Sequence, residues 1–343
     1  MRATTVVLIN IGTPESLAKK AVATYLHAFL MDPRIIPLPR VLRWLLVHGI
    51  IVPRRAKQSL HAYQQIWQPE GSPLAVYSQN LQDRLEQELS AQGYQVVTAM
   101  CYSAPRLEDV LKNCRSEEII LCPLFPQYAA VTTGGILAAA YTILGQRWDP
   151  PQIHTLQPFA DNLQFTTLLA DKIKSYGQAY DHLLFSFHGL PVDHLHQSQC
   201  QGLAKGACIL PQPCPSDKTH QAWCYRAQCY ATARQVVKHL QISPAQWSVS
   251  FQSRFGRKEW IKPYTEEQLK VLYEQGVRKL AVSCPAFVTD CLETLEEIGL
   301  RLRDEWLAFP GTSFHLIPCL NADEAWVKLL ASWIQKRGQV GES

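Results

Sequence analysis

The sequence lacks a strong charge of either sign. Its 343 residues include 33 basic and 29 acidic side chains, which leaves a net charge of only +4, and the lysines and arginines form no long run. Nucleic-acid binding usually requires a concentrated basic surface. We therefore expect a globular protein that binds no nucleic acid.

A long hydrophobic run is also missing. The longest apolar segment, residues 41–53, includes Arg43 and His48 and falls short of the roughly 20 apolar residues that a membrane-spanning helix needs. Residues 1–5 lead into an apolar stretch without the hydrophobic region of an export signal. We therefore expect a cytoplasmic protein.

Segment 41–53 has basic residues on both sides, namely Arg34, Arg40, Arg54, Arg55 and Lys57. Such a segment can rest on an anionic membrane surface or form the rim of an apolar pocket. A plain buried helix explains it equally well. Peripheral contact with the inner face of the membrane through residues 41–57 is therefore one of the alternatives.

Disulfide bonds are not expected either, although the sequence has 11 cysteines. A reducing cytosol keeps thiols free or bound to metal. Five of the cysteines lie within 30 residues, at positions 200, 208, 214, 224 and 229. This local density requires its own explanation.

What the sequence does contain is an alternation of strand and helix patterns. Strand-like runs at 6–11, 96–101 and 119–124 alternate with helical patterns, and after residues 149–151 the alternation begins again. Its second part has strand-like runs at 153–156, 183–187, 248–251, 280–284 and 314–317, and helical patterns at 162–176, 225–240, 266–275, 291–306 and 325–336. This pattern predicts an α/β fold with parallel sheets in two lobes.

We place the lobes at residues 1–155 and 156–320. The second lobe contains a Cys-rich insertion at 192–224, and residues 321–343 form a C-terminal helix that could pack across both lobes. Active sites of proteins with two lobes usually lie in the cleft between the lobes, so we expect the active site of this protein there.

Two proton-active side chains directly follow apolar runs. His188 follows residues 183–187, and Glu293 lies shortly after residues 280–284. An imidazole and a carboxylate that face one cavity could bind a divalent metal and move protons. The simpler interpretation of His188 is a core histidine that is hydrogen-bonded at a strand end. Glu293 has a simpler interpretation as well, because Asp290-x-x-Glu293 has the pattern of a helix capping box.

Glu297 lies four residues after Glu293, on the same face of the predicted helix. Like charges at this spacing destabilise a helix slightly unless a cation is near. A metal ion or a proton path would offset that repulsion. Glu297 and Asp290 would then extend an acidic route for protons or a metal ion.

Six strings, in this order along the chain, resemble the ferrochelatase family. They are Asn10-Ile11-Gly12-Thr13-Pro14, Gly71-Ser72-Pro73-Leu74, Pro123-Leu124-Phe125-Pro126-Gln127-Tyr128 with Thr132-Thr133-Gly134, Ser186-Phe187-His188-Gly189-Leu190-Pro191, Phe251-Gln252-Ser253-Arg254-Phe255-Gly256, and Asp290-Cys291-Leu292-Glu293-Thr294-Leu295-Glu296-Glu297. The resemblance implies two Rossmann-like lobes, each with a four-stranded parallel sheet, and a porphyrin cleft between them. It implies a lyase that inserts Fe²⁺ into protoporphyrin IX and releases two protons, in the last step of heme synthesis.

The resemblance also implies roles for individual residues. His188 and Glu293 would be the catalytic pair that meets Fe²⁺, with Glu297 and Asp290 as the relay. Ile11, Tyr128 and Trp260 would contact the macrocycle, and Ser72 would reach a propionate; core packing is the alternative for the aromatic pair. Cys101 and Cys291 depart from the family, since other members often have arginine and histidine there. Arg254 could bind a carboxylate, but we favour a structural role.

Four cysteines of the insertion, Cys200, Cys208, Cys214 and Cys224, are typical of metal ligands in a turn-rich loop. Their spacing matches neither the Cys-x2-Cys pairs of common zinc sites nor the plant-type ferredoxin pattern. The resemblance to bacterial ferrochelatases that carry a cluster implies a 2Fe-2S cluster, with zinc or free thiols as alternatives. Cys229 is left out of this set.

Two classes of function fit the sequence. The first is a ferrochelatase, for which coproporphyrin III is an alternative substrate to protoporphyrin IX. The second is a porphyrin- or heme-binding carrier or sensor with the same fold. Glu293 favours the enzyme, because a carrier needs no acidic group opposite the histidine.

Overall fold

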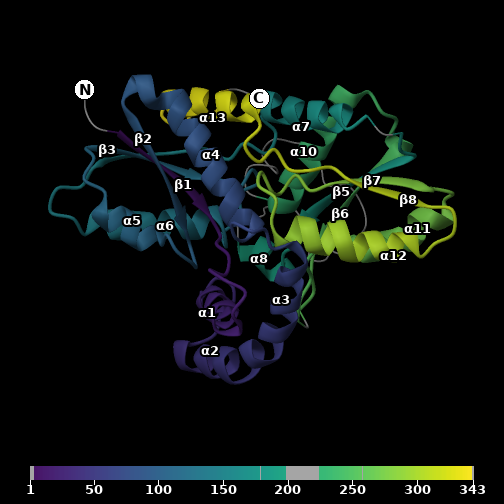
Figure 1. Ribbon diagram of the computed structural model, residues 1–343, viewed down its shortest axis with the longest axis horizontal. Helices are drawn as coiled ribbons and strands as arrows, with labels where there is room; N and C mark the ends of the chain where they lie inside the picture. Colours follow the sequence, from purple (N-terminus) through teal and green to yellow (C-terminus); the bar gives the residue numbers. More distant parts are fainter. Residues whose placement is uncertain (1–3, 178, 198–223, 257, 342–343) are drawn as a thin grey trace. The chain divides into compact units, whose positions relative to one another are not determined.

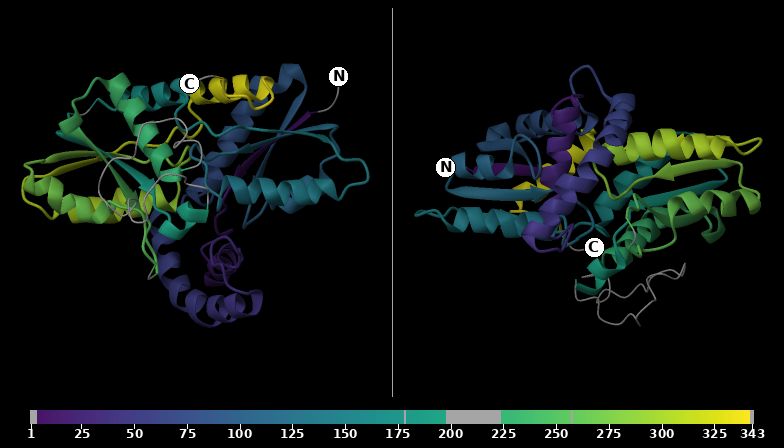
Figure 2. Two further views of the ribbon diagram at one scale, coloured as in Figure 1. Left: turned by 180° about the vertical axis from the view of Figure 1, so that it is seen from behind. Right: turned by 90° about the horizontal axis from the view of Figure 1, so that it is seen from below.

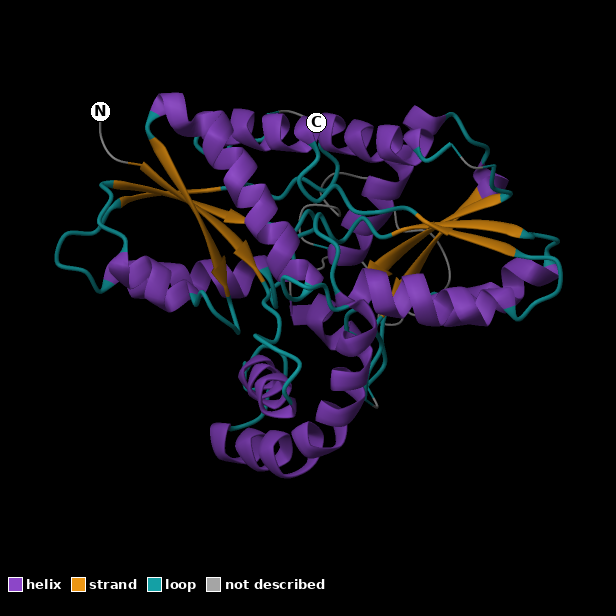
Figure 3. Ribbon diagram, in the orientation of Figure 1, coloured by secondary structure: helices purple, strands orange, loops and turns teal. Residues whose placement is uncertain are grey.

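The computed structural model describes residues 4–177, 179–197, 224–256 and 258–341. The chain forms two compact units. The first comprises Met1–Phe125, Ala130–Gln157 and Asn321–Val340, and the second comprises Pro126–Ala129, Pro158–Leu320 and Gly341–Ser343. Each unit contains a four-stranded parallel sheet with helices on both faces (Figure 3). The predicted α/β fold with two parallel sheets is confirmed.

The sheet of the first unit has the order β2-β1-β3-β4. Its strands are β1 (Thr4–Asn10), β2 (Tyr94–Met100), β3 (Glu118–Pro123) and β4 (Gln152–Thr155). Every residue of β1 is buried. Because side chains alternate between the faces of a strand, Val7 and Ile9 pack with α5 (Leu107–Asn113) and α6 (Thr133–Gly145). The other face is covered by α4 (Pro73–Leu89) and α13 (Glu324–Gln335), as Figure 1 shows.

The sheet of the second unit has the order β6-β5-β7-β8. Its strands are β5 (His182–His188), β6 (Trp247–Gln252), β7 (Lys279–Ser283) and β8 (Ser313–Leu316). Helices α7 (Leu163–Ser175) and α10 (Tyr225–Leu240) cover one face. The other carries α11 (Thr265–Glu274), η5 (Glu293–Leu302) and α12 (Arg303–Leu307) (Figures 1 and 2). Because the four strands are parallel, their carboxyl ends lie at one edge.

The first unit also has a helical insertion between β1 and α4. It contains α1 (Lys19–Leu30), α2 (Arg40–Leu46), η1 (Val47–Ile51) and α3 (Val52–Ile66). Val41 is 70% exposed and Leu42 is 55% exposed, so the interpretation of segment 41–53 as a plain buried helix is wrong. The described part of the chain contains no helix with the length and apolar character that crossing a membrane requires.

Three short elements complete the described structure: η2 (Ser90–Gln92), α8 (Val192–Gln197) and η4 (Pro244–Gln246). The predicted strands and helices of the second unit agree with the observed bounds within about two residues. This agreement follows from the strongly apolar strands, since every residue of β5 from His182 to Phe187 is buried.

Candidate active site

His188 is the last residue of β5, and its side chain is half buried. Its Nδ1 lies 2.6 Å from the carbonyl oxygen of Gly189. Because a carbonyl oxygen can only accept, Nδ1 carries a proton, so the neutral form of the ring would have its lone pair on Nε2. Nε2 makes no hydrogen bond with any described residue. That lone pair can accept a proton or bind a divalent metal ion.

The turn that follows His188 is tightly packed. A Cβ atom at Gly189 would lie 2.8 Å from the Gln252 carbonyl oxygen and 3.1 Å from Cε3 of Trp260. The Trp260 ring is 4% exposed, and its Nε1 donates to the Phe255 carbonyl oxygen at 3.0 Å. The hydroxyl of Tyr225 donates to the His188 carbonyl oxygen at 2.8 Å. These contacts fix the backbone on both sides of the imidazole.

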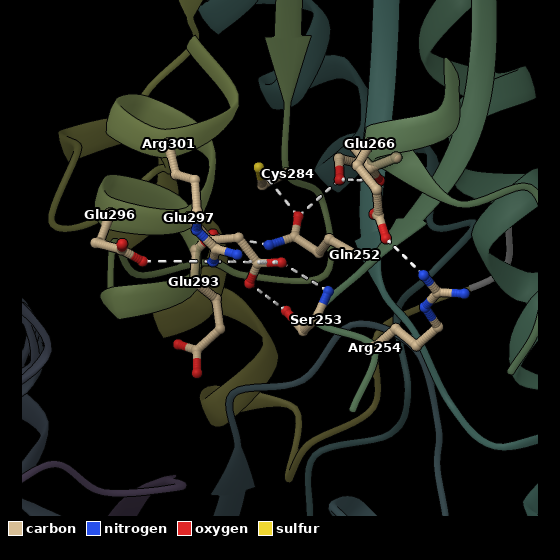
Figure 4. A network of polar contacts seen from close by, with 11 residues as sticks. Gln252, Ser253, Arg254, Glu266, Cys284, Glu293, Glu296, Glu297 and Arg301 are labelled. Atoms are coloured by element: carbon tan, nitrogen blue, oxygen red, sulfur yellow. Dashed lines mark hydrogen bonds and ion pairs between the residues drawn. The ribbon is translucent and has the colours of Figure 1, made fainter. Parts of the chain in front are cut away.

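Glu293 is the first residue of η5, which follows β7, and β7 is the neighbour of β5 in the sheet. The side chain is half buried, and its carboxylate points away from Gln252 and Glu297 (Figure 4). Burial, and then the charge of Glu293 and a hydrogen bond with it, raises the pKa of the Cys291 thiol. His188 and Glu293 therefore both lie at the carboxyl edge of one sheet.

The capping-box interpretation of Glu293 is wrong. Leu292, the residue before η5, already has helical dihedral angles, so the residue that precedes the helix is Cys291 and not Asp290. The Cys291 N–H donates to the Thr294 hydroxyl at 3.0 Å. Asp290 instead accepts a hydrogen bond from the Thr294 hydroxyl at 2.9 Å and another from the Cys319 N–H at 3.2 Å. Because the Asp290 carboxylate is 3% exposed, these contacts hold the loop after β8 against the start of η5.

Glu297 lies one turn further along η5. Its Oε1 accepts from the N–H of Ser253 at 2.7 Å, and its Oε2 accepts from the Ser253 hydroxyl at 2.6 Å. The guanidinium of Arg301 lies 4.0 Å from Oε1 and 3.5 Å from Oε2 of Glu296, so a cation neighbours the Glu297 carboxylate. Burial raises the pKa of Glu297, and the Ser253 bonds, Arg301 and His188 oppose that rise.

Gln252, the last residue of β6, connects the two sides of the site (Figure 4). Its Nε2 donates to the main-chain carbonyl oxygen of Glu293 at 2.7 Å, and its Oε1 accepts from the Ser186 hydroxyl at 2.7 Å. Its own main-chain carbonyl oxygen accepts from the N–H of Gly189 at 2.8 Å. One side chain thus links the strand of His188 to the helix of Glu293.

Comparison with known proteins decides the family. The family model described as ferrochelatase matches residues 3–338. The chain belongs to the ferrochelatase family. It is 42% identical to the ferrochelatase of Stutzerimonas stutzeri over 338 residues, 97% of each chain. It is 39% identical to that of Legionella pneumophila (strain Lens) over 333 residues, 96% of this chain and 98% of the relative.

The fold of this ferrochelatase family member is also similar to that of a solved structure. SirB from Bacillus subtilis with Fe³⁺ matches with a TM-score of 0.52 at 11% identity and covers 98% of this chain and 96% of SirB. At this identity the likeness shows the fold alone. The resemblance predicted from the six strings is confirmed at the level of the family.

The remaining candidate residues of this ferrochelatase family member lie in both units. Ile11 follows β1 and is half buried, while the hydroxyl of Ser72 accepts from the Ala75 N–H at the start of α4. In the second unit, the N–H of Tyr128 donates to Oε1 of Gln228 at 2.7 Å. Arg254 pairs with Glu266 in the first turn of α11 at 3.3 Å, and its structural role stays a prediction.

Of the four candidate cluster ligands, only Cys224 lies within the described residues. It is 1% exposed, and its sulfur accepts from the Ala227 N–H at the start of α10. Cys200, Cys208 and Cys214 lie outside the described residues. Among the residues that the structure describes, no group of three or more histidine, cysteine or acidic side chains could hold a metal ion.

The sequence analysis did not single out Gln252 and Ser253 as site residues. A signal for them was present, because two polar residues directly follow the apolar run of β6. Parallel strands present their functional residues at this edge. The same rule that found His188 would have found this pair.

Proposed function

We propose that this protein is a ferrochelatase that inserts Fe²⁺ into protoporphyrin IX and forms protoheme, in the last step of heme synthesis. The supporting observation is the location of His188 at the end of β5 and of Glu293 at the start of the helix that follows the neighbouring strand β7, in a chain that the ferrochelatase model matches along nearly its whole length. The reaction forms bonds from iron to the porphyrin nitrogens and breaks two pyrrole N–H bonds. Iron remains ferrous, so the step needs neither oxidant nor reductant.

Both residues offer a group that can accept a proton or bind Fe²⁺. The free lone pair on Nε2 of His188 can take a pyrrole proton or bind Fe²⁺, and the carboxylate of Glu293 can do the same from the helix. Each displaced proton needs an acceptor. We propose that Glu297 and Asp290 extend the path, and that Ile11, Ser72, Tyr128 and Trp260 bind the porphyrin.

The test is the loss of porphyrin fluorescence when Fe²⁺ is added. We expect His188→Ala and Glu293→Gln each to lower turnover at least about 100-fold, which is the usual contribution of a positioned base, while porphyrin binding persists. Glu305→Gln, at an exposed position of α12, is the control and should turn over as the wild type does.

Undiminished turnover in both variants would overturn the assignment of the catalytic pair. Porphyrin binding by the wild type without metallation would indicate a carrier or sensor. Faster metallation of coproporphyrin III than of protoporphyrin IX, in parallel assays, would change the assigned substrate.

We also propose that Cys200, Cys208, Cys214 and Cys224 hold a 2Fe-2S cluster. Four thiolates are a common ligand set for this cluster. The hydrogen bond from the Ala227 N–H to the Cys224 sulfur supports one of the four, because such donors stabilise a thiolate ligand. The cluster would stabilise the fold of the insertion and would take no part in the insertion of Fe²⁺.

Analysis of iron and acid-labile sulfide in protein purified without oxygen tests this second proposal. We expect sulfide in the wild type and its loss in Cys208→Ser. Cys114→Ser changes a half-buried cysteine of the first unit and should retain the sulfide. Zinc without sulfide, or wild-type protein with neither metal, would contradict the cluster.

We propose, finally, that the surface of α2 contacts anionic membranes. Its residues Val41, Leu42, Trp44 and Leu45 are exposed, and Arg40, Arg54 and Lys57, which flank them in the sequence, are exposed as well. Apolar insertion and attraction to anionic lipid reinforce one another in such segments.

A further inference from the structure

A buried amide at the end of β6 determines how the helix of Glu293 meets the sheet. The Gln252 side chain is 1% exposed, and both of its polar atoms are bonded. Oε1 accepts from the Ser186 hydroxyl, so Nε2 is directed toward the Glu293 carbonyl oxygen. Since the main-chain oxygen of Gln252 also accepts from the N–H of Gly189, one residue contacts the neighbours of both proposed catalytic groups.

The hydrogen bonds continue away from the site through buried hydroxyls. Ser186 bonds Thr265 at 2.9 Å, and Thr265 bonds Ser250 at 2.9 Å. All three side chains are at most 1% exposed. A buried polar chain with its partners in place is rigid, because breaking any bond would leave a group unsatisfied away from water. The Gln252 amide therefore has one preferred orientation.

Ser253 has a backbone conformation that its residue type disfavours. Its φ is +65°, in the left-handed region, which costs a non-glycine residue about 1–2 kcal/mol. In this conformation its N–H and its hydroxyl both bond the Glu297 carboxylate, one to each oxygen. Strained residues of this kind cluster at functional sites, and here the strain accompanies a two-point contact with a half-buried acid.

From these contacts we propose that Gln252 and Ser253 are positioning residues for metal insertion. Gln252 holds the first turn of η5 against the end of β5, and Ser253 holds the Glu297 carboxylate. Together they keep Glu293 and Glu297 at fixed positions relative to His188. This inference rests on the proposed function, because the relative positions of these three groups matter only if the groups act on one substrate.

The charge of Glu297 supports the role of Ser253. The groups that face this carboxylate are Ser253 in the turn after β6, His188 from β5, Arg301 from η5 and the Cys284 thiol, whose pKa Glu297 helps to raise. Burial raises the pKa of Glu297, and the Ser253 bonds lower it. Loss of the hydroxyl would therefore raise the pKa of Glu297 further and move the acid limb of the pH–rate profile to higher pH.

Ser253→Gly is the sharpest variant. Glycine adopts positive φ readily and retains the N–H bond, so only the hydroxyl contact is lost. We expect kcat to fall about tenfold and the acid limb to move up by about 0.5–1 pH unit, as for one hydrogen bond to a charged group. The KM for porphyrin and the unfolding temperature should remain near the wild-type values.

Two further variants complete the experiment. Ser175→Gly removes an exposed hydroxyl at the end of α7 and should leave kcat and the pH profile unchanged. Gln252→Leu, which removes the donor to the Glu293 carbonyl oxygen, should lower kcat more than Ser253→Gly does. If Gln252→Leu does not fold, the result for Ser253→Gly decides alone.

The outcomes separate this inference from the proposed function. Wild-type turnover with unaltered kcat and pH profile in Ser253→Gly would overturn the positioning role alone. A parallel loss of kcat and thermal stability with an unmoved pH profile would mean a purely structural role and would also overturn it. Failure of the wild type to metallate porphyrin would overturn both.

Discussion

At the scale of single residues, Gly189 limits what the site tolerates. A Cβ atom there would meet the Gln252 carbonyl oxygen at 2.8 Å and the Trp260 ring at 3.1 Å. The nearer atom belongs to the backbone and accepts from the N–H of Gly189 itself. It cannot move away without weakening that bond, so the close approach at this turn requires glycine.

We therefore predict that Gly189→Ala destabilises the second unit by about 1–3 kcal/mol, the usual cost of overpacking. For a unit of this size that lowers the unfolding temperature by roughly 2–4 °C per kcal/mol. Turnover should fall as well, because the shift occurs next to His188. Differential scanning calorimetry and the porphyrin assay measure the two effects.

Gly145→Ala, in α6, is the matched control for this substitution. An added Cβ there would meet nothing within 4 Å, and alanine favours a helix over glycine by up to about 1 kcal/mol. It should leave the unfolding temperature unchanged or raise it slightly. Equal unfolding temperatures for Gly189→Ala and the wild type would show that the turn adjusts freely, contrary to the prediction.

Residues differ in how far the sequence could predict their roles. The locations of His188 and Glu293 at one sheet edge follow from apolar runs that precede them, because such runs mark buried parallel strands. The left-handed backbone of Ser253 could not be predicted in this way, since glycine and asparagine are the usual residues there. Its conformation depends on Glu297, 44 residues later in the chain.

At the scale of elements, the sequence patterns predicted where the strands and helices occur, but not how the helix that contains Glu293 begins. Residues 291–306 have a helical pattern, and η5 and α12 together span Glu293–Leu307. The predicted cap was wrong because Asp290 bonds Thr294 and the Cys319 N–H. Cys319 follows β8, so this competing contact is a long-range one that local sequence rules do not contain.

The helical insertion between β1 and α4 is a second case in which the sequence pattern alone did not determine the structure. Its apolar composition was compatible with burial or with exposure. In the structure, one side of α2 is exposed: Val41, Leu42 and Leu45 are each more than half exposed. Arg43, by contrast, is only 7% exposed. The buried arginine donates to the Ile36 carbonyl oxygen at 3.0 Å, so the inward side of α2 contains a charged residue, which hydropathy alone does not predict.

At the scale of the whole molecule, each of the two units is built partly from segments that are distant from one another in the sequence. The alternation of strands and helices predicted two parallel sheets, and both are present. The C-terminal helix α13 belongs to the first unit, where its buried Trp326 and Trp333 lie on the same side of the sheet as α4. The apolar pattern of α13 predicts that the helix packs against other elements. Which unit it packs against depends on residues that are distant in the sequence.

The exposed side of α2 leads to a prediction about the whole protein and its surroundings. Large contiguous apolar surfaces are uncommon on soluble proteins and mark interaction sites. Exposed basic residues flank this segment in the sequence, namely Arg34, Arg40, Arg54 and Lys57. A surface that is both apolar and cationic suits an anionic lipid bilayer better than it suits a neutral protein.

We expect the protein to sediment with vesicles that contain phosphatidylserine and to release as salt rises, because salt screens exposed charges. Replacing Val41, Leu42 and Leu45 with serine should weaken binding about tenfold or more, since each change removes apolar area that the bilayer would bury. Serine at Leu163, Val271 and Leu307 is the control, since these side chains are 40–50% exposed on other helices. If both triple variants sediment as the wild type does, α2 is not the membrane-binding surface; if only the control binds normally, the exposed side of α2 is the surface that meets the lipid.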